Sequence, residues 1–191
     1  MTQPAAPEPF VVADHAAWRE WLTLNEDTHD GVWLLLAKKG TTDPTSLTYA
    51  EALDEALCSG WIDGQVKSLD DATFLRRFTP RRARSIWSRR NVEAIARLEA
   101  EGRLRDRGRT EVARAQEDGR WDRAYAGPAT AEAPPELAEA LARQPAAQAA
   151  FAALTGSDRF SALFPILTAT TDATRTRRID LLVARLREKS A

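Results

Sequence analysis

The fold is decided by residues 48–68, which read TYAEALDEALCSGWIDGQVKS. Thr48 and Glu51 have the spacing of a capping box, in which the threonine hydroxyl accepts the Glu51 backbone N–H and the glutamate reaches back. The box opens a helix whose leucines and alanines recur at helical spacing, and Gly60 is placed to end it. From Trp61 the pattern changes to the alternation of a strand. A helix followed directly by a strand predicts a mixed α and β fold.

Similar patterns mark further strands and helices. Residues 32–39 predict a strand. Its residues 32–37 are apolar on both alternating sets of side chains, which is typical of a central strand covered on both faces. Residues 61–68 and 73–79 stand on either side of an Asp70-Asp71 turn, so they predict a pair of strands. Helices are predicted at 88–101, 109–117, 135–143 and 145–154. Three more are predicted from their N-caps: one after Asp14, one from Ser157 or Asp158, and one from Asp172. In the helix that starts at 157 or 158, Pro165 should cause a kink or a break.

The predicted fold class is α+β, with a small antiparallel sheet packed with helices, followed by an all-helical C-terminal module. A length of 191 residues suits one compact domain with a small appended module. We expect a disordered tail at 1–9, the α+β domain at 10–126 and the helical module at 135–191. Residues 127–134, rich in alanine, threonine and proline, are the predicted linker.

Composition excludes several kinds of site. The chain contains one cysteine, Cys58, and two histidines, so no intramolecular disulfide, thiolate zinc site or histidine-built metal centre is expected. We interpret Cys58 as a buried, inert residue. No cofactor or metal is expected, and no residue is assigned a catalytic role, so the sequence leans away from an enzyme.

The sequence also carries expectations about location. The longest apolar run, residues 32–37, is far shorter than the ~20 residues that span a bilayer, so no membrane insertion is expected. Residues 1–9 lack the basic start and apolar stretch of a secretory signal. A cytoplasmic protein is therefore expected.

Charge is unevenly distributed along a chain whose formal net charge is −1. The segment Arg76–Arg109 holds twelve arginines against four acids, whereas the rest carries 15 basic and 24 acidic residues. Such a segment is typical of a surface that binds phosphate, nucleic acid or an acidic partner. Alternatively, these arginines pair with the acidic remainder across the fold. Both interpretations stay open.

One group of polar side chains lies on the strand 61–68 and its neighbour. A face that carries an indole, a carboxylate, an amide and an amine suits a wall facing a ligand better than a core. If the polar faces of the two strands coincide, Asp63 and Arg77 approach each other and could orient a polar ligand. The alternative is a solvated face with one surface pair worth ~0–1 kcal/mol. The candidate ligand-binding residues here are Trp61, Asp63, Gln65, Lys67, Arg77 and Thr79.

A second polar group surrounds the start of the helix predicted at 88–101. Free N–H groups and the helix dipole favour an anion at such a position, and an indole among arginines could stack a base. The alternative is that Trp87 packs in the core and Ser88 is a plain N-cap. The candidate ligand-binding residues here are Arg81, Arg84, Ser85, Trp87, Ser88 and Asn91.

Several segments together resemble the YdeI/OmpD-associated family, over nearly the whole chain from Phe10 to Leu186. The resemblance rests on EALDEALCSGWIDG (51–64), RFTPR (77–81), SIWSRRN (85–91), GRWDRAY (119–125), PPEL (134–137), AFAAL (150–154) and TRTRRI (174–179).

The resemblance implies protection against bacteriocins and cationic antimicrobial peptides, in association with an outer-membrane porin. It implies a C-terminal helical module at about residues 132–189 that also occurs on other N-terminal domains. The N-terminal part is similar to small α+β folds of the YjbR/CyaY type, which include frataxin-like proteins. The sequence shows no export signal, so it departs from the periplasmic location suggested for the family, and this argues against a porin partner. It also lacks the acidic helical ridge of a frataxin-like iron binder, which argues against metal binding. No catalytic residue carries over.

Three hypotheses follow. The first is a non-enzymatic stress or antimicrobial-resistance protein that binds a small anionic or polar molecule. The second is nucleic-acid binding through Arg76–Arg109, and the third is an enzyme that uses Asp63 held by Arg77. A protein partner remains an additional alternative.

Overall fold

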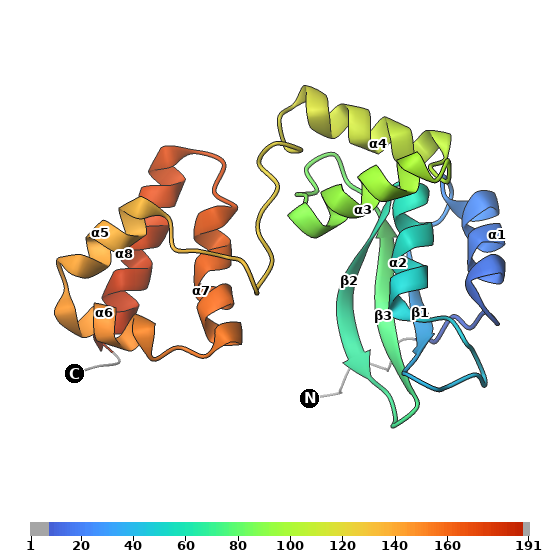
Figure 1. Cartoon of the computed structure of the whole chain (residues 1–191), viewed down its shortest axis with the longest axis horizontal. Coiled ribbons are helices and arrows are strands. Elements are labelled where there is room, and N and C mark those ends of the chain that lie inside the picture. The colour runs from blue at the N-terminus through green and yellow to red at the C-terminus, as the bar shows by residue number, and fades with distance from the viewer. Residues whose placement is uncertain (1–7, 189–191) are drawn as a thin grey trace, which may run out of the picture. The chain divides into compact units, whose positions relative to one another are not determined.

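The computed structural model describes residues 8–188, so residues 1–7 of the predicted disordered tail lie outside the described part. The described chain forms one three-stranded sheet and eight α-helices (Figure 1), which confirms the predicted α+β class. The strands are β1 (Val32–Ala37), β2 (Trp61–Ser68) and β3 (Thr73–Pro80). The helices are α1 (His15–Asn25), α2 (Tyr49–Cys58), α3 (Arg89–Ala100), α4 (Asp106–Glu117), α5 (Pro135–Ala142), α6 (Pro145–Ala152), α7 (Gly156–Leu167) and α8 (Asp172–Glu188).

The described chain packs as two compact units. The first consists of the chain up to Ser85 together with Asn91–Asp122, and the second of Ile86–Arg90 and the chain from Arg123 onward. The short segment Ile86–Arg90 pairs inside the second unit, where Trp87 O accepts the Tyr125 N–H at 3.0 Å. Within the described residues, no helix is long and apolar enough to cross a membrane.

The sheet is antiparallel with the order β1-β3-β2, so β3 is central. The prediction that β1 is the central strand is wrong, although its side chains are buried on both faces, as at Leu34 and Leu35. One reason is that Phe10 forms a parallel bridge beside β1 and accepts the Leu35 N–H at 2.9 Å. An edge strand covered in this way has the same apolar pattern as a central one.

The capping box at Thr48 is present as predicted. The Thr48 hydroxyl accepts the Glu51 N–H at 3.4 Å, and the Glu51 carboxylate accepts the Thr48 N–H at 3.0 Å. The helix α2 packs against the sheet, and α1 and α4 pack against α2 (Figure 1). Aromatic side chains fill this core, where Trp18 meets Trp61 and Phe78 at ring-centroid distances of 6.3 and 5.8 Å.

A β-bulge in β2 changes which side chains share a face. Asp63 lies opposite Phe78, but Val66 lies opposite Arg76, so β2 has one residue more than β3 in this interval. An extra residue moves every later side chain to the other face. Lys67 therefore lies opposite Leu75, on the other face from Asp63, and the prediction that the two share a face is wrong.

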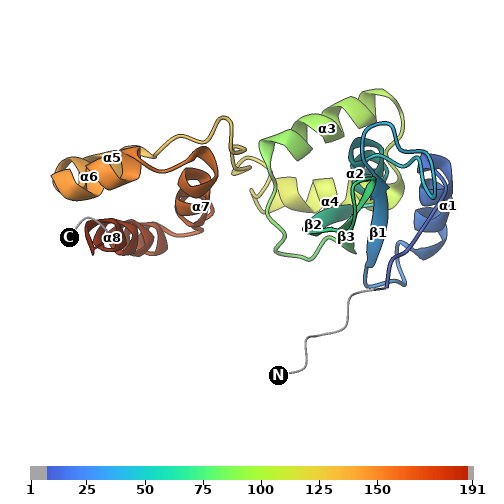
Figure 2. The ribbon, with the colours of Figure 1, turned by 90° about the horizontal axis from the view of Figure 1, so that it is seen from below.

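The second unit has an apolar core of its own. The helix α8 packs against α5, α6 and α7 (Figure 2). Its helical spacing predicts Ile179, Leu182, Val183 and Leu186 as inward side chains, and Val183 is partly buried whereas the other three are buried. Pro165 lies in the last turn of α7 and does not divide that helix, because a proline near the end interrupts few backbone hydrogen bonds.

Candidate functional site

Two tryptophans of the predicted ligand site belong to the core. Trp61 is fully buried, and its Nε1 donates to the Glu26 carbonyl at 3.2 Å. Trp87 is 2% exposed. Neither indole therefore offers a surface to a ligand in this structure, and the core interpretation of Trp87 fits better.

Asp63 has a different partner from the one predicted. Its carboxylate accepts Arg76 Nε at 3.0 Å and the Tyr49 hydroxyl at 2.9 Å. Arg77 instead reaches the Asp30 carbonyl, at 3.5 Å. Because Asp63 lies opposite Phe78, the β3 side chain on its face is Arg76. The expected approach of Asp63 to Arg77 is therefore wrong.

The other candidate residues of the sheet lie apart from Asp63. Gln65 and Lys67 are exposed, and Thr79 is half-buried. The Lys67 ammonium lies over the Trp33 ring, 4.9 Å from its centroid. The structure thus gives Lys67 a cation–π contact on the face opposite to Asp63.

The candidates around the start of α3 are divided between the two units. Arg81 is buried and its N–H donates to the Gly60 carbonyl at 3.0 Å, while Arg84 is exposed. Ser85 accepts the Arg82 N–H at 2.9 Å. Asn91, in the first unit, is buried, and Ser88, in the second, bridges to Tyr125.

At least six of the twelve arginines in the basic segment form ion pairs with carboxylates, which favours the pairing interpretation for those six. The pairs are Arg76 with Asp63, Arg97 with Asp54 and Glu101, Arg103 with Asp54, Glu55 and Glu101, Arg105 with Glu26 and Glu55, Arg107 with Asp27, and Arg109 with Glu99.

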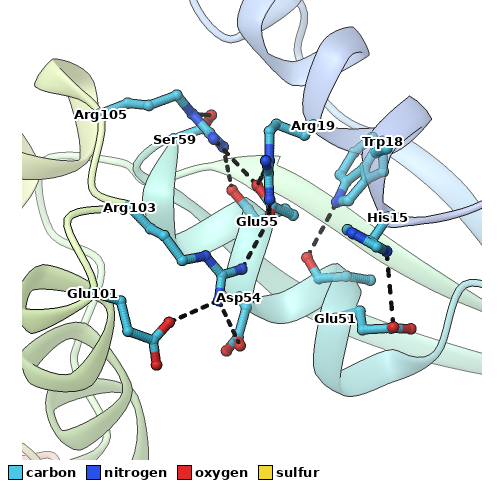
Figure 3. Close-up of polar contacts among 12 residues, drawn as sticks. His15, Trp18, Arg19, Glu51, Asp54, Glu55, Ser59, Glu101, Arg103 and Arg105 are labelled. Atoms are coloured by element: carbon cyan, nitrogen blue, oxygen red, sulfur yellow. Dashed lines mark hydrogen bonds and ion pairs between the residues drawn. The ribbon is translucent and has the colours of Figure 1, made fainter.

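Three arginines donate hydrogen bonds to one buried carboxylate, that of Glu55 (Figure 3). Glu55 is not among the candidate residues predicted from the sequence. The Glu55 side chain on α2 is 1% exposed. It accepts Arg19 at 2.8 and 3.0 Å, Arg103 at 2.8 Å and Arg105 at 3.2 Å. Arg105 also donates to Ser59 Oγ at 2.8 Å. Buried charges occur where they are paired and hydrogen-bonded, and Glu55 meets both conditions.

The partners of Glu55 decide its charge. Burial by itself raises the pKa of this carboxyl, but hydrogen bonds from Arg19, Arg103 and Arg105 outweigh burial and lower its pKa to about 2. Glu55 is therefore ionised throughout the neutral range. Nearby, burial raises the pKa of the Cys58 thiol to about 11, which fits the buried, inert residue that was predicted.

A pocket of about 370 Å³ opens beside Glu55, and we name it the charged pocket. Helix α1 contributes His15 and Arg19, which are one helical turn apart and so lie on one face. The remaining lining residues come from α2 and from the segment before α4, and they are Glu51, Asp54, Glu55 and Arg103.

The two walls of the charged pocket differ in character. The α1 wall carries an imidazole and a guanidinium, and these side chains are 49% and 48% exposed. The α2 wall carries carboxylates, with His15 Nδ1 3.9 Å from Glu51 Oε1. Within residues 8–188, no group of three His, Cys, Asp or Glu side chains is arranged to hold a metal ion. The arrangement suits a molecule with both an anionic and a cationic group.

A signal for this pocket exists in the sequence. Glu55 falls among the inward positions of α2, beside Ala52 and Ala56, where an unpartnered charge is costly. A carboxylate at such a position requires cationic partners from elsewhere in the chain. The sequence does not show which of the 23 arginines they are.

Comparison with protein families finds a match for most of the first unit. Residues 10–111, more than half of the chain, match the family described as "Domain of unknown function (DUF8412)". The chain belongs to this family. The six residues that line the charged pocket all fall inside the DUF8412 match.

The helical part matches a second family. Residues 130–189 match the description "Bacteriocin-protection, YdeI or OmpD-Associated", which supports a protein of this type at the level of the family. The resemblance noted from the sequence is thus supported over these residues, whereas the YjbR/CyaY likeness of the N-terminal part has no support. No curated protein and no solved structure matches the chain significantly.

Proposed function

We propose that this chain is a protective protein of the bacteriocin-protection type that binds a small polar ligand in the charged pocket without catalysis. The observation that carries the proposal is the pocket itself, in which the Arg19 guanidinium and the His15 imidazole of the α1 wall stand against the carboxylates of the α2 wall. A ligand that carries one group of each sign, such as a zwitterion, matches both walls at once.

The pocket is organised before any ligand arrives. Glu55 accepts two hydrogen bonds from Arg19, through Nε and Nη2, and one from Arg103, so these guanidinium groups are fixed in orientation. Arg19 Nη1 makes no hydrogen bond to any residue between 8 and 188, so this donor is available to a ligand. Fixed charges lose little conformational entropy on binding, which favours affinity. His15 Nδ1 lies 3.9 Å from Glu51 Oε1, beyond hydrogen-bond distance, and its half-exposed ring can turn toward a ligand.

The other two hypotheses have less support. Nucleic-acid binding needs arginines that are available to phosphates, and six of the twelve in Arg76–Arg109 already pair with carboxylates. Catalysis by Asp63 needs a carboxylate that can reach a substrate, whereas the largely buried Asp63 carboxylate is hydrogen-bonded to Arg76 and Tyr49. The helical match at 130–189 supports the protective role.

The test measures zwitterion binding by saturation-transfer NMR on the full chain. Glycine, lysine and glutamate serve as probes, with acetate and methylammonium as singly charged comparisons. We expect saturable binding of at least one of the three amino acids. Acetate and methylammonium, which carry one charge each, should give weaker saturation-transfer signals. His15→Glu should weaken that binding about tenfold or more, because it replaces a donor to the ligand carboxylate with a like charge.

The matched control is Glu20→Gln, an exposed position on α1 outside the lining of the pocket. This variant should bind the probe as the unmodified chain does. The proposal fails if none of the amino acids binds, or if His15→Glu and the unmodified chain bind equally well.

A further inference from the structure

A second pocket, of about 300 Å³, lies within the helical unit between α5, the start of α6 and α8. Its polar lining comes from Arg143, Gln144, Asp180 and Arg187, and its floor includes Ala140 and Ala184. We name it the helical-unit pocket. None of its residues takes part in the charged pocket, so it stands on separate observations.

The two arginines of this pocket differ from those around Glu55. Neither the Arg143 nor the Arg187 guanidinium makes a hydrogen bond or an ion pair with any residue between 8 and 188, and both side chains are exposed. In the first unit, by contrast, Arg19, Arg103 and Arg105 share one carboxylate. The helical-unit pocket therefore presents two guanidinium groups whose donors are available.

Local backbone structure places these groups together. Arg143 is the C-cap of α5, and Gln144 is the N-cap of α6, where its side chain makes no capping hydrogen bond. Arg187 comes from α8, whose Ala184 lines the same pocket one turn earlier.

Asp180 gives the pocket a direction. It lies seven residues before Arg187 on α8, a distance of roughly 10 Å along a helix. The part of the pocket next to Arg187 is therefore the part of the α8 wall that lies farther from the Asp180 carboxylate. Small side chains at Ala140 and Ala184 leave room for an anion.

We propose that the helical-unit pocket binds the phosphate group of a small molecule through Arg143 and Arg187. Guanidinium groups donate in a fork that matches a tetrahedral oxyanion, and two of them neutralise a dianion. A singly charged carboxylate group accepts hydrogen bonds from fewer of these donors, so it should bind more weakly than phosphate. The inference goes beyond the proposed function, since it adds a second ligand site in another unit.

The test is a titration of the ¹⁵N-labelled full chain with sodium phosphate at constant ionic strength, followed by NMR. We expect saturable shifts of the Gln144, Ala147 and Ala184 amides. Sodium acetate at the same ionic strength should produce much smaller shifts. Equal responses to both salts would mean that the arginines only sense screening, and they would overturn the proposal.

Variants separate the pocket from general surface charge. The double variant Arg143→Gln, Arg187→Gln should weaken phosphate binding at least tenfold. Because both side chains are exposed, we expect this variant to fold normally. The matched control, Arg177→Gln with Arg185→Gln, removes two exposed α8 arginines outside the pocket lining and should change little. Asp180→Asn should tighten binding, because it removes a negative charge.

Two results would contradict the assignment of these residues. One is phosphate binding that survives the Arg143→Gln, Arg187→Gln double change. The other is an equal loss in the control pair, which would mean that any two exposed arginines of the helical unit serve as well. His15→Glu, which alters the charged pocket, should leave phosphate binding unchanged, so failure at one pocket is distinguishable from failure at the other.

Discussion

Arg19 and Glu55 join α1 to α2 by two parallel hydrogen bonds, with Arg19 Nε 3.0 Å from Glu55 Oε2 and Nη2 2.8 Å from Oε1. The geometry is the paired fork that guanidinium and carboxylate groups favour. Because Arg103 and Arg105 bind the same carboxylate, Glu55 also ties α2 to the segment between α3 and α4. One buried side chain thus links three parts of the first unit.

The first prediction concerns this link. Glu55→Gln removes the charge that three arginines share, and the free energy of unfolding should fall by about 2–3 kcal/mol, since breaking a buried ion pair leaves its partners uncompensated. Urea denaturation measures the change. Glu101→Gln, which removes an exposed partner of Arg97 and Arg103, should cost clearly less. Equal losses in the two variants would contradict the central role of Glu55.

The second prediction concerns acid. The pKa of Glu55 is lowered from its ordinary value of 4.5 to about 2. As the pH falls, the Glu55 carboxylate is therefore protonated in the unfolded chain at a higher pH than in the folded chain. The stability that Glu55 contributes is therefore fully present above pH 4.5 and is lost as the pH falls toward 2. Unfolding free energies measured from pH 6 to pH 2.5 should show this loss. The Glu55→Gln variant should show a flatter profile, and an unchanged profile would refute the assignment.

The third prediction tests the contact between α4 and α2. Gly108 lies so close to α2 that a Cβ would meet the carbonyl oxygen of Cys58, and the Leu57 oxygen at 3.1 Å. Gly108→Ala should therefore destabilise the chain by about 1–3 kcal/mol, despite the better helix propensity of alanine. Thermal unfolding provides the measurement. Gly127→Ala, with open space around its Cβ, should leave the melting temperature within error, and a loss there of the same size would contradict the steric argument.

The fourth prediction separates two neighbouring arginines of β3. Arg76→Gln should lower the free energy of unfolding by about 1–3 kcal/mol, because it breaks a charged hydrogen bond to the largely buried Asp63. Arg77→Gln should cost less than about 0.5 kcal/mol, since its 3.5 Å contact with Asp30 is at the limit of a hydrogen bond. The reverse order would mean that Asp63 pairs with Arg77 in solution.

Features that depend on a few neighbouring residues could be predicted from the sequence. The capping box needs only Thr48 and Glu51, three residues apart, and it forms as expected. The inward positions of α8 follow from helical spacing alone. In both cases the deciding interactions lie within one or two helical turns, so local pattern and observed structure agree.

Features that depend on a partner far along the chain could not be predicted. The bulge in β2 falls at Gly64 and Gln65, and a glycine inside a strand is one signal of a bulge, but the register that results exists only relative to β3. Arg19 and Glu55 are 36 residues apart, and many arginines compete for the same carboxylate. For this reason the prediction of one polar face on β2 is wrong. Because of the single extra residue in β2, Asp63 shares a face with Arg76, and Lys67 lies on the opposite face.

The assignment of Ile86–Arg90 to the helical unit has a consequence for how this chain can be divided. The residues before and after this segment belong to the other unit, so the polypeptide passes between the units at 85–86, 90–91 and 122–123. A gene fragment that starts at residue 123 would carry Tyr125 but lose Trp87, whose carbonyl accepts its N–H. Moving the complete helical unit into another protein therefore requires two coding pieces rather than a single C-terminal fusion.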